Sequence, residues 1–283
     1  ACSNHAGGFP YVAIMFEKEM TVNRRWWDGV TPVHFRSRSY DVDGFRRGAS
    51  SLLPMEVSEL GDVSGKSLLH LQCHFGLDTL SWARRGAIVT GIDFSQEAIS
   101  TARGLSDHLG VPGRFIESNL YSLPDVLDEK FDIVYTGYGA ICWLPDLKRW
   151  AEIIARFLRP GGIFYIVEGH PMTNLINDEI ADRVDLTGRY FNHGPVRYES
   201  PNTYTDSEEP LRERVTYAWE HPLSDVVNSV ISAGLRIERL NESRLGFFKA
   251  HPLTRRREDG HWEFPDGISD MPLTFSLLAR SPD

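Results

Sequence analysis

Short apolar runs in the middle of the sequence are followed at once by residues that can bind a ligand or transfer a proton. Gln72-Cys-His-Phe-Gly76 follows the run 66–71, and Asp93 ends the run 87–92. Amide, imidazole and carboxylate groups at such positions can hydrogen-bond the hydroxyls and ring nitrogens of a nucleoside. Three further apolar runs are followed in the same way by polar or glycine-rich segments, at residues 118–121, 136–139 and 168–171.

Asp93 is the most specific of these residues. An acidic side chain at the end of a second strand can accept hydrogen bonds from both ribose hydroxyls of an adenosine ligand. Its alternative role, as the N-cap of the next helix, is less favoured because Ser95 already suits that position. Asn119 could bond the edge of the adenine ring, with Leu120 packing near the ring face, although an isolated asparagine is more often a turn former.

The order of the predicted elements that position these residues indicates an α/β fold. Short buried strands alternate with amphipathic helices from residue 66 to 168, as in stacked βαβ units. We predict strands at 66–71, 87–92, 114–117, 131–135 and 163–167, and helices at 76–85, 95–109 and 146–158. Pro160-Gly-Gly162 is a stop and turn signal before the fifth strand. Ligands of such sheets bind outside the carboxyl ends of the strands.

The alternation breaks after residue 169. Residues 170–220 hold four prolines among aromatic and β-branched residues, so we expect an inserted cap that is part helical and part antiparallel strand. A helix at 223–233 and strands at 235–240 and 272–279 then complete the core, which suggests an antiparallel edge. The expected fold is a Rossmann-like sheet of seven mostly parallel strands, with helices on both faces and an inserted cap.

Five segments resemble the motifs of class I methyltransferases, in the order that this family has them. Leu68-Leu-His-Leu-Gln-Cys-His-Phe-Gly76 resembles the first motif, a strand followed by Gly-x-Gly-x-Gly. Ile92-Asp93 is similar to the acidic second motif, and Ser118-Asn119 to the adenine-recognition position. Phe131-Asp-Ile-Val and Leu158-Arg-Pro-Gly-Gly162 resemble the fourth- and fifth-strand signatures. The resemblance covers residues 66–168 and continues more loosely through the final strands.

The resemblance implies S-adenosylmethionine as the cofactor. The residues that it places at the cofactor are Gln72, Cys73, His74, Gly76, Asp93, Phe94, Asn119, Leu120, Thr136 and, from the lid, Tyr40. The sequence departs from the motif where Gln72 and His74 replace glycines and His70 replaces the usual acid. Histidine is among the residues enriched at positive φ, and a cofactor without phosphate tolerates a tighter loop than a dinucleotide does.

The resemblance also implies a division of the chain. We expect a flexible N-terminal arm at 1–20, lid helices at 21–60, the cofactor-binding core at 61–169, the substrate cap at 170–221 and the completion of the core sheet at 222–283. Residues 1–14 are given no role in the fold.

Methyl transfer from a sulfonium is an in-line displacement, and a hydroxyl acceptor usually needs a general base. His170 follows the fifth strand and is our candidate base, although it could instead brace the turn at 169–171. Glu168 and Tyr138 are candidates for positioning the acceptor. His193 and His221, near the ends of the cap, are expected to be structural.

The composition limits the partners. The net charge is −9, and the one dense basic run, Arg255-Arg-Arg257, is followed by two acids, so we expect no nucleic-acid partner. No apolar run reaches the length of about 20 residues that spans a bilayer. Three scattered cysteines predict neither a disulfide framework nor a metal site. We therefore expect a cytoplasmic protein that acts on a small molecule, and a homodimer is compatible with the sequence.

Three function classes remain open. The first is a methyltransferase acting on an oxygen, nitrogen or carbon atom of a small molecule, most simply in the biosynthesis of a secondary metabolite. The second is a non-catalytic adenosine-binding module, which the altered first motif allows. The third is a nicotinamide-dependent oxidoreductase, which would need the Gly-x-Gly-x-x-Gly turn that is absent here.

Overall fold

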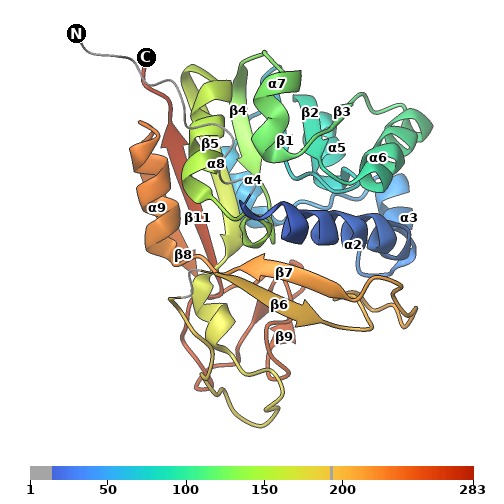
Figure 1. Ribbon diagram of the computed structural model, residues 1–283, viewed down its shortest axis with the longest axis vertical. Coiled ribbons are helices and arrows are strands. Elements are labelled where there is room, and N and C mark those ends of the chain that lie inside the picture. Colours follow the sequence, from blue (N-terminus) through green and yellow to red (C-terminus); the bar gives the residue numbers. More distant parts are fainter. Residues whose placement is uncertain (1–14, 192–193) are drawn as a thin grey trace.

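A seven-stranded sheet forms the centre of the computed structural model, which describes residues 15–191 and 194–283 (Figure 1). The strand order is β3-β2-β1-β4-β5-β11-β8, so the order reverses between β1 and β4. The strands of this sheet are β1 (Ser67–Leu71), β2 (Ile88–Asp93), β3 (Arg114–Glu117), β4 (Phe131–Thr136), β5 (Leu158–Gly169), β8 (Arg236–Ser243) and β11 (Thr274–Arg280). The predicted seven-stranded, mostly parallel sheet is confirmed.

The sheet differs from the prediction in two details. The strand β11 pairs antiparallel with both β5 and β8, so the antiparallel strand is internal and β8 forms the edge. Pro160-Gly-Gly162, predicted as a turn, lies within β5. There the pairing with β4 shifts register between Phe131 and Ile133, and Gly161 takes a positive φ of 68°. The chain therefore passes from helix to strand through an irregularity of the ladder, without a separate turn.

Helices cover both faces of the sheet because each has one apolar stripe. On one face, α8 (Leu147–Phe157) and α9 (Leu223–Ser232) bury residues such as Trp150 and Val226 in the largest core cluster. On the other face lie α4 (Pro54–Leu60), α5 (Leu77–Arg84) and α6 (Gln96–Leu109). Ser95 accepts a hydrogen bond from the Ala98 amide and so caps α6, as expected.

The N-terminal segment is more helical than predicted. The helix α2 (Glu17–Arg36) includes residues 17–20, which were assigned to the arm. Met20 in this segment is buried, so the first turns of α2 pack against the rest of the protein. The predicted arm residues 1–14 lie outside the described part of the chain. The short helix α3 (Val42–Arg46) follows, and then α4. No helix within residues 15–191 and 194–283 is both long and apolar enough to span a membrane.

Two segments outside the core gather beyond the carboxyl ends of the parallel strands (Figure 1). The first holds the 3-10 helix η3 (Pro171–Leu175) and a hairpin of β6 (Pro195–Glu199) and β7 (Val215–Trp219). The second holds the small pair β9 (Arg255–Arg256) and β10 (Trp262–Glu263). Asn23 of α2 bonds both the amide and the carbonyl of Tyr217, which fastens α2 to β7. The remaining short helices are η1 (Leu120–Ser122), α7 (Leu123–Val126) and η2 (Ile141–Trp143).

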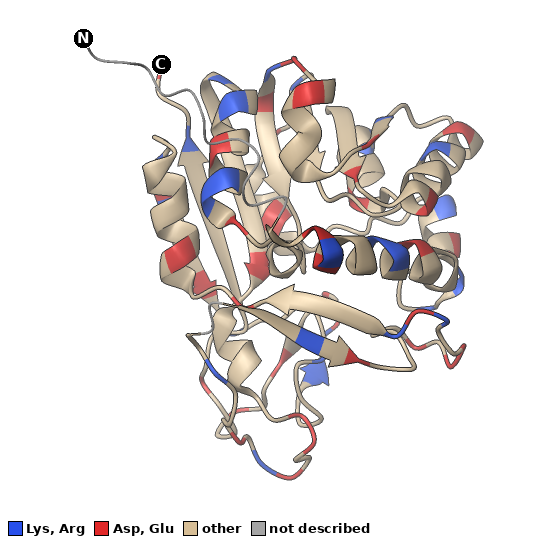
Figure 2. Ribbon diagram, viewed as in Figure 1, with Lys and Arg blue, Asp and Glu red and all other residues tan. Residues whose placement is uncertain are grey.

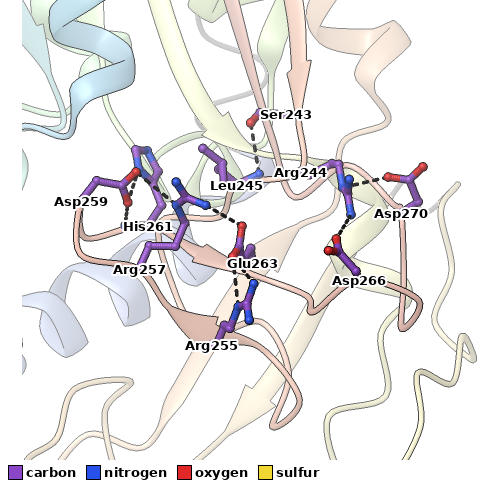
Figure 3. Close-up of polar contacts among 10 residues, drawn as sticks. All are labelled: Ser243, Arg244, Leu245, Arg255, Arg257, Asp259, His261, Glu263, Asp266 and Asp270. Carbon is purple, nitrogen blue, oxygen red and sulfur yellow. Dashed lines mark hydrogen bonds and ion pairs between the residues drawn. The ribbon is translucent and has the colours of Figure 1, made fainter.

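Charged residues of both signs are interspersed along the chain (Figure 2). The basic run at 255–257 is compensated locally: Glu263 pairs with Arg255 at 2.9 Å and with Arg257 at 2.8 Å (Figure 3). Arg257 also pairs with Asp259 at 3.2 Å. These ion pairs hold the β9–β10 segment together and leave no concentrated positive charge there.

Gly91 of β2 offers a test of the packing beneath the site. A Cβ atom at this position would lie 2.8 Å from Cys73 Sγ and 3.0 Å from the Phe115 ring. We expect Gly91→Ala to lower the free energy of unfolding by about 1–3 kcal/mol, because the neighbours are too close to accept a methyl group. Denaturant unfolding would measure the change.

Gly104→Ala is the matched control. Gly104 is exposed within α6, and nothing lies within 4 Å of its added Cβ. This variant should gain about 0.5–1 kcal/mol of stability through helix propensity. Equal effects of the two substitutions would contradict the close packing of β2 against Cys73.

Candidate active site

The loop after β1 keeps a left-handed backbone at the three positions where the resembled motif has glycines. Gln72 has φ 57°, His74 has φ 50° and Gly76 has φ 81°. Non-glycine residues pay about 1–2 kcal/mol for this conformation. Gly76 could not be replaced in the same way, because a Cβ there would lie 2.7 Å from the Phe115 ring. The loop therefore has the geometry of a glycine motif despite its two substitutions.

Asp93 fixes this loop to the start of α6. Its Oδ2 accepts from the His74 amide and its Oδ1 from the Ser95 amide, both at 2.9 Å. Asp93 is 7% exposed, and burial raises its pKa to about 6 in spite of these bonds. Asp28 of α2 accepts from the Ser95 hydroxyl at 2.7 Å, so the lid helix is joined to the same point.

The structure places the predicted adenine-side residues around the same edge. Asn119 Oδ1 accepts from the Tyr121 amide at 2.9 Å, so its carbonyl group caps η1, and its Nδ2 lies 4.0 Å from Met20 Sδ. Leu120 is buried in the core, whereas Phe94 is partly exposed. The adenine role of Asn119 remains a prediction that rests on the amide nitrogen.

Three buried polar atoms at the carboxyl ends of β1 and β4 have no hydrogen-bond partner within the described chain. They are Gln72 Oε1, His74 Nδ1 and Thr136 Oγ1. Buried polar groups are normally paired, so such atoms mark a place where a polar ligand fits. Gln72 Nε2 donates to the Ala140 carbonyl at 2.9 Å and ties the two loops together. The donors and acceptors present suit an adenosine cofactor that carries an amino acid.

Cys73, by contrast, is a packing residue. Its side chain is 4% exposed, and burial raises the pKa of the thiol well above its usual range. The thiol stays protonated, as expected for a residue that is no nucleophile.

Aromatic and imidazole rings of the lid and the cap close over the loop. Trp27 lies 4.9 Å from the His74 ring, and Tyr40 stacks on His34 at 5.2 Å. The Tyr40 hydroxyl bonds the Tyr204 hydroxyl at 2.5 Å. Tyr40 therefore reaches the cap rather than standing free at the cofactor.

A pair of histidines, which no sequence pattern predicted, lies at the centre of these rings. His34 Nδ1 is 3.1 Å from His74 Nε2, and His34 Nε2 is 2.5 Å from the Thr203 hydroxyl. Burial lowers the pKa of His34 to about 3 and that of His74 well below its usual range. Both imidazoles are neutral at physiological pH. The two histidines are 40 residues apart in the sequence, so only the fold brings them together.

The three predicted catalytic residues have other partners. His170 is 3% exposed; its Nε2 lies 2.8 Å from Glu242 Oε1, and its Nδ1 accepts from the Met172 amide at 3.1 Å. Both ring nitrogens are thus engaged, which favours the bracing role over the general base. Tyr138 donates to Glu56 at 2.7 Å.

Glu168 positions a loop. Its carboxylate accepts from the amides of Gly139, Ala140, Ile141 and Gly169, at 2.6, 2.7, 3.2 and 2.7 Å. Glu168 therefore shapes the loop after β4 instead of facing the acceptor. His221 Nε2–H donates to the Leu144 carbonyl at 2.8 Å, as a structural histidine would. His193 lies outside the described residues.

Comparisons with known proteins agree with this geometry. Residues 69–166 match the family model of the methyltransferase domain. A ubiquinone biosynthesis O-methyltransferase of Alkalilimnicola ehrlichii is 31% identical over 156 residues, which are 53% of this chain and 58% of that protein. The corresponding enzyme of Photorhabdus laumondii is 26% identical over 150 residues, 52% of this chain and 57% of that protein. The chain thus spans little more than half the length of these relatives.

Solved structures show the same fold. An S-adenosylmethionine-dependent methyltransferase of Clostridium acetobutylicum has a TM-score of 0.55 at 14% identity, with 96% of this chain and 98% of that chain covered. The magnesium protoporphyrin IX methyltransferase of Synechocystis has a TM-score of 0.51 at 13% identity, over 99% of this chain and 100% of that chain.

The strand order and the loops at its switch point define a doubly wound α/β protein, a class in which ligands bind at the carboxyl edge where the strand order reverses, here between β1 and β4. Within that class, residues 69–166 match the methyltransferase domain, and the fold is that of the class I, S-adenosylmethionine-dependent methyltransferases. The predicted fold is confirmed, and S-adenosylmethionine, the predicted cofactor, is the cofactor of the family that residues 69–166 match.

Glu56 links α4 to the loop after β4 and yields a prediction about pH. It is fully buried and accepts from the Leu53 amide at 2.6 Å and from the Tyr138 hydroxyl. Burial raises its pKa from 4.5 to about 7. Protonated Glu56 stabilises the folded state relative to the ionised form. This contribution is fully present below pH 4.5 and is lost as the pH rises through about 7.

We expect Glu56→Gln to remove this loss. As the pH rises from 5 to 8, the variant should gain stability relative to the wild type: the difference between their free energies of unfolding should change by up to about 3 kcal/mol in favour of the variant. Denaturant titrations at both pH values would measure it. Glu179→Gln, the same change at an exposed residue, should follow the wild type. A constant difference between Glu56→Gln and wild type would show that Glu56 is ionised throughout.

Proposed function

We propose that this chain transfers the methyl group of S-adenosylmethionine to an oxygen atom of a small molecule. The observation that carries the proposal is the left-handed loop at Gln72, His74 and Gly76, fastened by its amide to Asp93. This arrangement supports an adenosine cofactor, and it argues against a dinucleotide because two side chains stand where a pyrophosphate would need bare backbone. The curated relatives named above are O-methyltransferases, which supports oxygen as the acceptor atom.

The proposal gives roles to the residues of the cofactor site and to those of the lid and cap. Asp93 would hold the ribose hydroxyls, and Asn119 the adenine edge. When bound, the cofactor supplies an electrophilic methyl group. The lid and cap residues would exclude water and align the acceptor, which matters because alignment supplies much of the rate of an in-line displacement. The small-molecule acceptor and the cytoplasmic location expected from the sequence belong to the same proposal.

His74 is our candidate for the general base. Its Nδ1 has no partner within the described chain, and its Nε2 faces His34 Nδ1. A neutral imidazole can take the proton of an acceptor hydroxyl at Nδ1, and His34 can then accept a hydrogen bond from the imidazolium Nε2–H. With Nδ1 as the acceptor, His34 carries its proton on Nε2 and donates it to the Thr203 hydroxyl.

Calorimetric titration with S-adenosylhomocysteine tests the cofactor site. We expect micromolar binding by the wild type, a loss of about 10- to 100-fold in Asp93→Asn, and no binding of NADH. Asp107→Asn, at the exposed far end of α6, is the matched control and should bind as the wild type does. No binding of S-adenosylhomocysteine to the wild type would end the proposal.

A pH profile tests the base. With phenols and alcohols as acceptors, we expect methyl transfer that stays constant down to below pH 6, because burial keeps His74 unprotonated. His74→Asn should lower kcat by about 100-fold or more while the affinity for S-adenosylhomocysteine changes far less. Amines of the same carbon skeletons serve as controls. Transfer to the amines alone, or an unchanged kcat in the variant, would contradict the role.

A further inference from the structure

The acid that the resembled motif carries in its first strand is missing here. His70 stands at that position, 4% exposed, with its Nδ1 2.8 Å from the Thr79 hydroxyl. Burial lowers the pKa of His70 to about 3, so the ring is neutral. The first strand therefore offers no negative charge to a ligand.

Asp78 brings a carboxylate to the same region from the next element. It lies in the first turn of α5, directly after the loop 72–76. A Cβ atom added to Gly137 would lie 3.6 Å from Asp78 Oδ2 and 3.3 Å from the Tyr135 hydroxyl. Gly137 follows β4, so the Asp78 carboxylate lies between the ends of β1 and β4, where the strand order reverses.

The surroundings of Asp78 hold no cation. In residues 15–191 and 194–283 it forms no ion pair with any lysine, arginine or histidine, and its side chain bonds only the Ser51 hydroxyl. Its charge raises the pKa of groups that are acids themselves, Glu56 and Tyr40 among them. A partly buried carboxylate without a positive partner is costly, which indicates a place for a cationic ligand.

A second, independent observation lies beside it. Gln72 Oε1 is buried without a partner in the described chain, while the same side chain's Nε2 bonds the Ala140 carbonyl. The Tyr135 hydroxyl, in a side chain that is 0% exposed, lies next to Gly137 and can accept a hydrogen bond. The Asp78 carboxylate and the Tyr135 hydroxyl thus lie together at Gly137, and Gln72 is bonded to the same loop after β4. An ammonium group, with three N–H donors, matches this set.

We propose that Asp78, with Gln72 Oε1, binds the α-ammonium group of the cofactor's amino acid in place of the acid that is lost at His70. The inference rests on the proposed function, since it assigns a residue to the same cofactor. It explains how a first motif with a neutral strand position can still recognise an amino-acid ligand. A charge-assisted hydrogen bond supplies this recognition.

Calorimetry with two ligands tests the assignment. The first ligand is S-adenosylhomocysteine, and the second is its analogue with hydrogen in place of the α-amino group. Wild type should bind the first more tightly than the second, by about 10- to 100-fold. Asp78→Asn should lose that preference, by binding the first more weakly and the second unchanged. Asp107→Asn should keep the preference.

The outcomes separate this inference from the proposed function. Wild-type binding of neither ligand would contradict the proposed function itself. Equal wild-type affinity for both ligands, or a preference retained in Asp78→Asn, would overturn only the role of Asp78. Equal loss of both ligands in Asp78→Asn would show a structural role, such as stabilising the first turn of α5. Thermal unfolding of each variant would confirm that it is folded, and Gln72→Met should reduce the preference in the same direction.

Discussion

The carboxylate of Asp93 is the interaction on which the site depends. It joins the end of β2, the loop after β1 and the start of α6 through two amide hydrogen bonds. The bond to His74 holds a residue at positive φ, a conformation that is uncommon for any residue other than glycine. The strain of the loop is thus balanced by a buried carboxylate, and the lid helix is attached to the same point through Asp28 and Ser95.

The lid and cap are held by a second kind of constraint, bonds between segments far apart in the sequence. Asp206 of the cap pairs with Arg38 at 2.8 Å and accepts from the Ser39 amide at 3.0 Å. Arg36 pairs with Glu209 at 2.8 Å. These ion pairs are exposed, so each contributes little stability, and they are weakened by salt. The surface pairs can break at small energetic cost, whereas the bonds of Asn23 and Asp28 keep α2 attached to β7 and to the start of α6.

The core elements could be predicted from the sequence, because their signals are local. The strand β3 has the predicted bounds, β1 and β4 differ from the prediction by one residue at one end, and β2 differs by one residue at both ends. The internal place of β11 could not be predicted, since antiparallel pairing depends on a partner more than 100 residues away. The same holds for His170, whose partner Glu242 comes from β8, and for the His34–His74 pair. Site residues could be predicted where their position at the end of a strand places them in the site. They were missed where contacts between distant segments place them there.

The charges at the switch point have a consequence for turnover under the proposed function. Asp78, Asp93 and Glu56 form no ion pairs with a lysine or arginine in the described chain, and burial raises the pKa of each. Where these carboxyls are ionised, they attract a sulfonium more strongly than a neutral thioether, because low-dielectric surroundings enlarge the Coulomb attraction. Methyl transfer removes the sulfonium charge, so this part of the attraction acts on the cofactor and not on the product. The neutral state of His34 and His74 preserves this difference, since imidazolium rings at the same place would cancel the negative field.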